Sequence, residues 1–572
     1  MKTLETNDDF GLLRAILTES SENNWWYLLG LLENWSIHSQ QIAVDYAKEH
    51  LKDWPNYIKT YPSIPLKNIL EKPDTWIPHQ LATCLELKPQ HTEREDLESL
   101  TSAPFLKRIK RLGFFNKCGG PKELQGLANS PYLQQLTELH IHNIEGGEAL
   151  AQIIIGAPAF CDLKDFTIGY GKLGVEGIEK LLHSQNLQHI ETLVVSDEHF
   201  GAKGAQVIKD APQVGQLKTL YLYSNQLGDE GVNILANVQR LSNLETLRLI
   251  SNGISAKGAQ SIANSPHFTN LKELDLSYNE LKNEGVIALA QSTTIKNLNN
   301  LVLSHSGISI EGIKALTSST LVESLSSMTL WSNQLGEDEM LSIANSPYLA
   351  KLKTLSISHN ELGDKGAIAL ANSPYLHKLE RLYLGSNNIG SKGAQALAHS
   401  PVSSGLVDLD LGYNNIGSKG VSSFFGTPYL RHLKELNLSD NNIGSEGAKT
   451  LAQLEQLKNL TVLTLKSNQL SPEGLKAIVT ATSFETLQVL DLESNELDFE
   501  AAKIIAESFA LFALKTLNIS RNELGAEGAL ALAKTQRLSN LHTLDLSFNM
   551  IYGEAKKVLQ ASPFLQNMNL QL

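Results

Sequence analysis

Two histidines and two glycine-flanked lysines are the residues of this chain whose types could support chemistry. His305 and His359 could bind a metal ion, but the repeat described below places them two strands apart, about 10 Å at 4.8 Å per strand. Lys392 and Lys419 follow glycine-rich segments, yet each precedes glycine where a phosphate-binding Walker loop needs Ser or Thr. The sequence also has no HExxH and no GxSxG. We therefore predict no enzyme activity, no catalytic residue, no metal and no cofactor.

A unit of 27 residues, which recurs through most of the chain, carries these side chains. With Asn387 as a marker, 12 intervals of 27 run from Asn225 to Asn549 without insertion or deletion, inside the frame L-x-x-L-x-L-x-x-N-x-L. The marker is serine at Ser306. The expected structural asparagines are Asn225, Asn252, Asn279, Asn333, Asn360, Asn387, Asn414, Asn441, Asn468, Asn495, Asn522 and Asn549.

The two halves of the unit predict a strand followed by a helix. The alternating L-x-L favours a short strand with its leucines inward. The small residues of G-A-x-A-L-A-x-S-P favour a closely packed helix that ends before a proline such as Pro374 or Pro401. The asparagine amide can satisfy backbone groups that the turn leaves unpaired. Because one such unit cannot bury its own apolar face, the units must stack into a solenoid.

The pattern resembles the leucine-rich repeat, of the longer helix-bearing type found in ribonuclease inhibitor and Ran GTPase-activating proteins. The resemblance implies an α/β leucine-rich-repeat solenoid, a horseshoe with a parallel sheet on the concave side and helices on the convex side. We expect about 18 repeats over residues 79–572, degenerate over 79–216 and regular over 217–572. In the degenerate units the markers fall on Glu198, Gly171, Ile144, Lys117 and Gln90.

Residues 1–78 differ in composition and hold five of the six tryptophans. Their apolar spacing predicts a small helical domain, followed by a proline-rich connector. One interpretation is that this domain only caps the first repeat. The stretch DDFGLLRAIL…LLGLLENW is similar to the short helical companion domain of some bacterial leucine-rich-repeat proteins. The segment SIPLKNIL (63–70) is similar to the opening of an F-box, which would imply a ubiquitin-ligase adaptor.

Charge and cysteine content limit the partners and the compartment. The formal net charge of −13 argues against nucleic acid or an anionic membrane as main partner. Cys84, Cys118 and Cys161 are too widely spaced for a disulfide framework or a zinc site, so we expect buried thiols in a reducing compartment. With no signal sequence and no long apolar run, we expect a cytoplasmic protein, preferably monomeric, with signal-independent export into a host cell as an alternative.

Function should lie in residues that the repeat does not require. The side chains between the frame leucines are expected to face outward from the concave sheet, and aromatic and arginine side chains carry most interface energy. The predicted partner-binding residues are Tyr221, Tyr223, Arg248, Ile250, Trp331, Tyr383, Asp410, Asp491 and Glu493. The acidic later strands would steer a basic partner. The alternative is that a long sheet scatters a few aromatics by chance.

These features favour a non-enzymatic scaffold that grips a protein partner on its concave face. Two alternatives stay open. The resemblance to Ran GTPase-activating proteins would imply a regulator of a small GTPase. The N-terminal domain would instead suggest a ubiquitin-ligase adaptor.

Overall fold

The protein is described by a computed structural model that covers residues 8–18, 20–33, 35, 40–61, 65–73, 75–89, 92–507, 512–566 and 568–572. Its contacts divide the chain into two compact units. The first unit comprises residues 1–254 and 264–271, and the second comprises 255–263 and 272–572.

The first unit begins with helices, as the apolar spacing predicted. They are α1 (Asp8–Leu17), α2 (Glu22–Glu33), α3 (Gln40–His50), α4 (Leu66–Leu70) and α5 (Ile77–Leu81). The fully buried Trp25 of α2 donates its indole N–H to the Thr60 carbonyl at 2.8 Å. Thr60 in turn forms a parallel bridge with Cys84 in the first strand. The connector is therefore built into the beginning of the sheet. Of the F-box-like segment, residues 63 and 64 lie outside the described residues, Pro65 precedes α4, and the remaining residues form α4.

Seven parallel strands of the first unit follow in chain order. They are β1 (Cys84–Leu87), β2 (Arg111–Phe115), β3 (Glu138–His142), β4 (Asp165–Gly169), β5 (Thr192–Ser196), β6 (Thr219–Tyr223) and β7 (Thr246–Arg248). The helices between them are α6 (Arg94–Leu100), α7 (Pro121–Ala128), α8 (Gly147–Gly156), α9 (Gly174–Leu182), α10 (Gly201–Asp210) and α11 (Gly228–Ala236). Cys84 pairs with Arg111 and Asp165 with Thr192, each 27 positions on. The phase of the degenerate repeats is thus confirmed.

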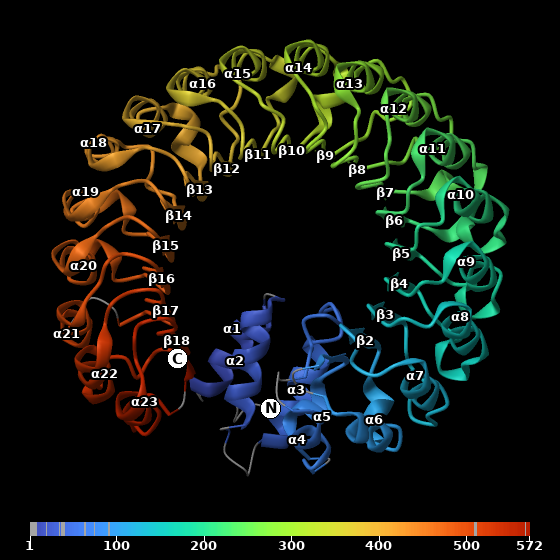
Figure 1. Cartoon of the computed structure of the whole chain (residues 1–572), viewed down its shortest axis with the longest axis horizontal. Coiled ribbons are helices and arrows are strands. Elements are labelled where there is room, and N and C mark those ends of the chain that lie inside the picture. The colour runs from blue at the N-terminus through green and yellow to red at the C-terminus, as the bar shows by residue number, and fades with distance from the viewer. Residues whose placement is uncertain are drawn as a thin grey trace. The chain divides into compact units, whose positions relative to one another are not determined.

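The second unit continues the same pattern. Its strands are β8 (Glu273–Asp275), β9 (Asn300–Val302), β10 (Ser327–Thr329), β11 (Thr354–Ser356), β12 (Arg381–Tyr383), β13 (Asp408–Asp410), β14 (Glu435–Asn437), β15 (Val462–Thr464), β16 (Val489–Asp491), β17 (Thr516–Asn518), β18 (Thr543–Asp545) and β19 (Asn569–Gln571). Its helices are α12 (Ala256–Ala263), α13 (Lys282–Ala290), α14 (Ile310–Thr317), α15 (Glu337–Ala344), α16 (Gly363–Ala371), α17 (Ser391–Ala398), α18 (Gly417–Ser422), α19 (Gly444–Leu451), α20 (Ser471–Val479), α21 (Phe499–Glu507), α22 (Gly525–Lys534) and α23 (Gly553–Gln560). Within each unit the strands lie on the inner side of the curve and the helices on the outer side (Figure 1).

A ladder of buried asparagines joins each repeat to its neighbours. The Oδ1 of Asn414 accepts the backbone N–H groups of Asn387 at 3.0 Å and Ile389 at 2.9 Å. Its Nδ2 donates to the carbonyls of Leu384, Leu411 and Gly412 at 2.9–3.1 Å. One side chain therefore satisfies backbone groups of two successive turns.

Serine makes a second ladder that the sequence analysis did not anticipate. The hydroxyl of Ser373, in the S-P that follows α16, donates to the Ala344 carbonyl at the end of α15 at 2.5 Å. Ser346 does the same for Thr317. Since the last carbonyls of a helix have no partner within it, these serines cap each preceding helix. The S-P pair thus combines a helix stop with a capping bond between repeats.

Departures from the repeat have local structural explanations. At Gly393 an added Cβ would lie 2.9 Å from the Ala367 Cβ, so α17 needs glycine to pack against α16. Glu339, which replaces this glycine in α15, accepts the N–H of Gly336 at 2.9 Å and caps its own helix. The expectation of buried thiols is wrong for Cys161, which is exposed. Cys161 follows a short 3-10 turn, and the matching position in later repeats holds polar residues such as Lys296.

Candidate partner-binding surface

Four rings pack against one another on the inner face of the second unit. The rings of Tyr278 and His305 stack with centroids 4.4 Å apart. Trp331 meets His305 edge-on at 4.7 Å and His359 edge-on at 5.2 Å. We call these four residues the aromatic cluster. Tyr278, His305 and His359 are exposed and Trp331 is half-buried, so the cluster presents ordered ring surface to solvent.

Three members of the aromatic cluster occupy a position that the sequence analysis did not consider as a contact position. Tyr278, His305 and His359 each directly precede a repeat marker and have φ of 50–57°. This left-handed conformation ends the strand and turns the backbone toward the buried asparagine. In the sequence, a bulky residue directly before the marker could have indicated these contact positions. Conversely, Asp275 and Ser277, which were expected to face outward, are buried, and Ser277 donates its hydroxyl to the Asp275 carboxylate at 2.6 Å.

Strands β12 to β14 carry a group of carboxylates beside Tyr383. The Tyr383 hydroxyl donates to the Asp408 carboxylate at 2.6 Å, and burial and this bond raise the pKa of Tyr383. Asp410 accepts from the Asn437 amide at 2.9 Å and the Gly412 N–H at 2.8 Å. Burial, and then the charge of Asp408, nevertheless raise the pKa of Asp410.

Further along the second unit, opposite charges are balanced within the chain. Glu493 lies 3.1 Å from the Lys466 ammonium and 3.2 Å from the Arg521 guanidinium. The Arg521 guanidinium also lies 4.6 Å from the centre of the exposed Phe548 ring. Burial raises the pKa of Asp491, which accepts the N–H of Glu493 at 2.9 Å. Because Lys466 and Arg521 already neutralise the Glu493 carboxylate, Glu493 is less suited than Asp491 to form an ion pair with a partner.

The remaining predicted residues lie on the first unit. The Arg248 guanidinium stacks 4.5 Å from the centre of the Tyr221 ring, and both side chains are half-buried. Tyr223 is 41% exposed and Ile250 is half-buried. Tyr221, Tyr223, Arg248 and Ile250 therefore form a group on the first unit, whereas the aromatic cluster belongs to the second unit.

Glu138, His140 and Asp165, on β3 and β4, have the side-chain types of a metal site. One ligand atom from each lies within 4.8 Å of the others. However, the two oxygens of Glu138 already face the Arg111 guanidinium at 3.4 Å and the Asn56 amide at 2.6 Å. His140 and Asp165 lie 3.3 Å apart. We interpret the group as a polar network that fastens the connector to the sheet.

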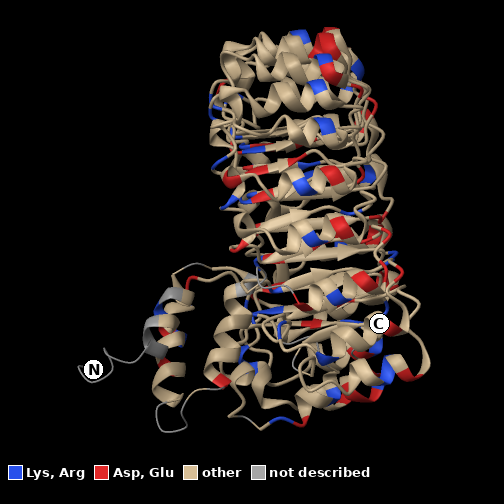
Figure 2. Cartoon of the chain, turned by 90° about the vertical axis from the view of Figure 1, so that its left-hand side faces the viewer, with Lys and Arg blue, Asp and Glu red and all other residues tan. Residues whose placement is uncertain are grey.

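Charged residues on the outer helices of the second unit are mixed in sign (Figure 2). Many form exposed pairs, such as Lys449 with Glu446 at 2.7 Å in α19 and Lys503 with Glu500 at 2.9 Å in α21. Exposed pairs of this kind contribute little to stability. None of the helices in the described part of the chain combines the length and apolar character needed to cross a membrane.

One protein-family model matches parts of the chain. The family described as Leucine Rich repeat matches residues 240–263, 267–290, 348–371, 375–398, 403–425, 429–452, 456–479 and 512–533. A search of curated proteins finds no match.

Three solved structures illustrate what the chain resembles. An internalin (InlF) from Listeria monocytogenes is 19% identical, with 60% of this chain and 93% of that chain covered and a TM-score of 0.38. The complex of Rad7 and Elc1 in yeast is 18% identical, with 59% and 77% covered and a TM-score of 0.37. A leucine-rich-repeat protein of Leptospira interrogans is 19% identical, with 90% and 99% covered and a TM-score of 0.33.

Proposed function

We propose that this chain, a leucine-rich-repeat protein, is a non-enzymatic scaffold that binds a protein partner on the inner face of its sheet. The observation that carries the proposal is the aromatic cluster of Tyr278, His305, Trp331 and His359, which the leucine and asparagine frame does not need. A contiguous group of rings at the surface, which the repeat frame does not need, is typical of a binding site.

The contacts inside the aromatic cluster suit it to binding. Because each ring packs on the next, the side chains are already ordered and lose little conformational freedom when a partner covers them. A buried aromatic anchor at such an interface contributes on the order of 2 kcal/mol or more. Trp331 lies in the middle of the row and touches both histidines, so we assign it the largest share.

The carboxylates of β12 to β14 supply the negatively charged part of the proposed binding surface. Asp408 and Asp410 lie on one strand and Glu435 on the next, and the pKa values of Asp410 and Glu435 are raised by burial and by Asp408. A partner with lysine or arginine beside an apolar segment would satisfy both regions. Tyr221, Tyr223, Arg248 and Ile250 form a second proposed contact region on the first unit. The ribonuclease-inhibitor-like subtype and the cytoplasmic location stay predictions.

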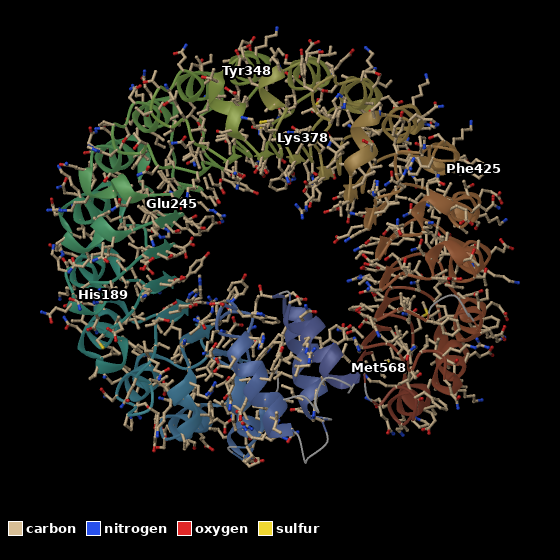
Figure 3. The ribbon with its side chains drawn as sticks, turned by 180° about the vertical axis from the view of Figure 1, so that it is seen from behind. His189, Glu245, Tyr348, Lys378, Phe425 and Met568 are labelled. Carbon is tan, nitrogen blue, oxygen red and sulfur yellow. The ribbon has the colours of Figure 1, made fainter. Side chains whose placement is uncertain are left out.

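The test is a quantitative pull-down from the native cell lysate with wild type and with His305→Ala/Trp331→Ala. The matched control is Phe425→Ala, since Phe425 is 62% exposed on the outer side of the second unit (Figure 3). We expect a protein that is retained by wild type and the control and lost from the double variant. Equal capture by all three would contradict binding at the aromatic cluster. Loss from the control as well would indicate nonspecific capture by exposed rings.

A further inference from the structure

A pocket in the first unit is lined by six cationic side chains. It has a volume of about 540 Å³ and lies where α3, the connector and the segment before β2 meet. The six are Lys48, Lys52, Lys59, Lys107, Arg108 and Lys110, and Glu49 is the one carboxylate in the lining. In a chain with a net charge of −13, such a concentration of positive charge departs from the average surface.

Only the outer lysines of the pocket have carboxylate partners within the described residues. Lys48 lies 3.2 Å from Asp45, and Lys52 lies 2.5 Å from Glu49. Lys59, Lys107, Arg108 and Lys110 form no ion pair in the described part of the chain. Lys107 instead lies 5.2 Å from the centre of the Tyr132 ring. Four positive charges of the lining, on the exposed Lys107 and Lys110 and on the more buried Lys59 and Arg108, are thus left without a carboxylate at ion-pair distance.

Burial and the neighbouring cations destabilise the charged form of Lys59. It is only 4% exposed, and one of its three N–H groups donates to the Leu51 carbonyl at 3.0 Å. Burial, and then the charge of Lys110, lower the pKa of Lys59 to about 8. Glu138 and Asp53 lie near enough to oppose this shift but do not cancel it. A buried ammonium next to another cation is destabilised unless an anion joins them.

Arg108 supplies a donor without an acceptor. Its Nε is buried and has no hydrogen-bond partner among the residues that the structure describes, and burial lowers the pKa of Arg108. A guanidinium has its donors in a fixed fork that matches the oxygens of phosphate. Buried polar atoms without partners are rare in folded proteins and commonly mark a missing ligand or water.

We propose that this pocket binds a small anion that carries two or more phosphate groups. Phosphate oxygens would accept from the free donors of Lys59 and Arg108, while Lys107 and Lys110 would neutralise further charge at the mouth. The volume lies within the usual range of small-molecule sites, and several cations around one pocket suit more than one phosphate. This function is independent of the aromatic cluster, which lies on the second unit.

The test is isothermal titration of the full chain with sodium tripolyphosphate at constant ionic strength, with sodium sulfate as the comparison anion. The variant is Lys107→Gln/Lys110→Gln, because both side chains are exposed and their loss leaves the core intact. The control, Lys203→Gln/Lys378→Gln, removes the same charge from exposed positions outside the pocket. We expect saturable one-to-one binding that weakens at least about tenfold in the pocket variant, as the loss of charge-assisted contacts implies, and is unchanged in the control.

Two further measurements keep the proposal open to refutation. Titrations at pH 8 in two buffers of different ionisation enthalpy should reveal proton uptake, since a bound anion raises the lowered pKa of Lys59. Lys59→Met should abolish that uptake. The proposal is overturned if tripolyphosphate does not saturate, if both double variants lose affinity equally, or if single-stranded RNA binds and tripolyphosphate does not.

Discussion

Replacing a single ladder asparagine should loosen the chain locally and by a large amount. Asn414 is 8% exposed and makes five hydrogen bonds to backbone groups. In Asn414→Ala the N–H groups of Asn387 and Ile389 lose their acceptor, and the carbonyls lose two donor hydrogens. A buried group left unsatisfied costs about 1–3 kcal/mol. With some relaxation and water entry, we expect a total loss of about 4 kcal/mol.

The measurement should be local, because a long repeat array need not unfold as one cooperative body. Amide hydrogen exchange, read on the peptide that spans residues 384–390, reports the Asn387 and Ile389 amides directly. A loss of about 4 kcal/mol corresponds to exchange roughly a thousand times faster, if these amides exchange through opening of the repeat.

The neighbouring asparagine provides a matched control. Asn415 is exposed, and it donates its backbone N–H to the Ile389 carbonyl, a bond that alanine keeps. Asn415→Ala should therefore change the free energy of opening by less than about 0.5 kcal/mol. If both variants exchange alike, the ladder does not hold successive turns together, and the leucine core alone accounts for the repeat.

Three further perturbations follow from the same structure. Lys59→Met should raise the free energy of unfolding at pH 7 by up to about 3 kcal/mol, because wild type buries a cation whose pKa falls from 10.5 to about 8, and each pKa unit corresponds to about 1.4 kcal/mol. Between pH 8 and 10.5 the unfolded state of wild type binds more protons than the folded state, so the stability of wild type rises with pH over this range. The stability difference between Lys59→Met and wild type, measured by urea unfolding, should therefore be smaller at pH 10.5 than at pH 7. An equal difference at both pH values would contradict the lowered pKa of Lys59. Asp410→Asn should be neutral or stabilising by up to about 1 kcal/mol at pH 7 and lose that gain near pH 4, since the pKa of Asp410 is raised; thermal unfolding at both pH values would check this. Trp331→Ala/Tyr383→Ala should lower the free energy of unfolding by less than about 2 kcal/mol, since neither belongs to the leucine frame; a large fall in Tm would contradict their outward placement.

The fold could be predicted from the sequence because each frame residue has one structural task. Leu382 and its counterparts in neighbouring repeats, such as Leu355 and Leu409, are buried, and the marker asparagine bonds to fixed backbone atoms. Both constraints recur every 27 residues, so the register of the strands follows from the spacing alone. The serine ladder obeys the same period but was interpreted only as a helix stop, because the following proline gave a sufficient reason for the pattern.

The partner-binding surface was only partly predictable, because the prediction assumed that side chains alternate inward and outward as in a strand, whereas some of the contact residues lie beyond the end of the strand. The residue before each marker has positive φ, so its side chain leaves the strand pattern and joins neighbours in the adjacent repeats. This is why His305 and His359 were weighed as metal ligands and not as ring partners of Trp331. Repeats with bulky residues at this position, such as Tyr413 and Phe548, should be searched first for contact surface in similar chains.

The cationic pocket lay outside the reach of the repeat pattern for a different reason. Its side chains come from α3, the connector and the segment before β2, which no period links. Net charge, an average over the whole chain, argued against anionic partners, whereas affinity for a small anion depends on the few charges that burial brings together. Lys59 and Lys449 illustrate this dependence on position. Burial lowers the pKa of Lys59, whereas Lys449 on an outer helix is exposed and paired with Glu446. A negative net charge therefore argues against a predominantly basic surface but is compatible with an enclosed anion site where the N-terminal helices pack on the first repeats.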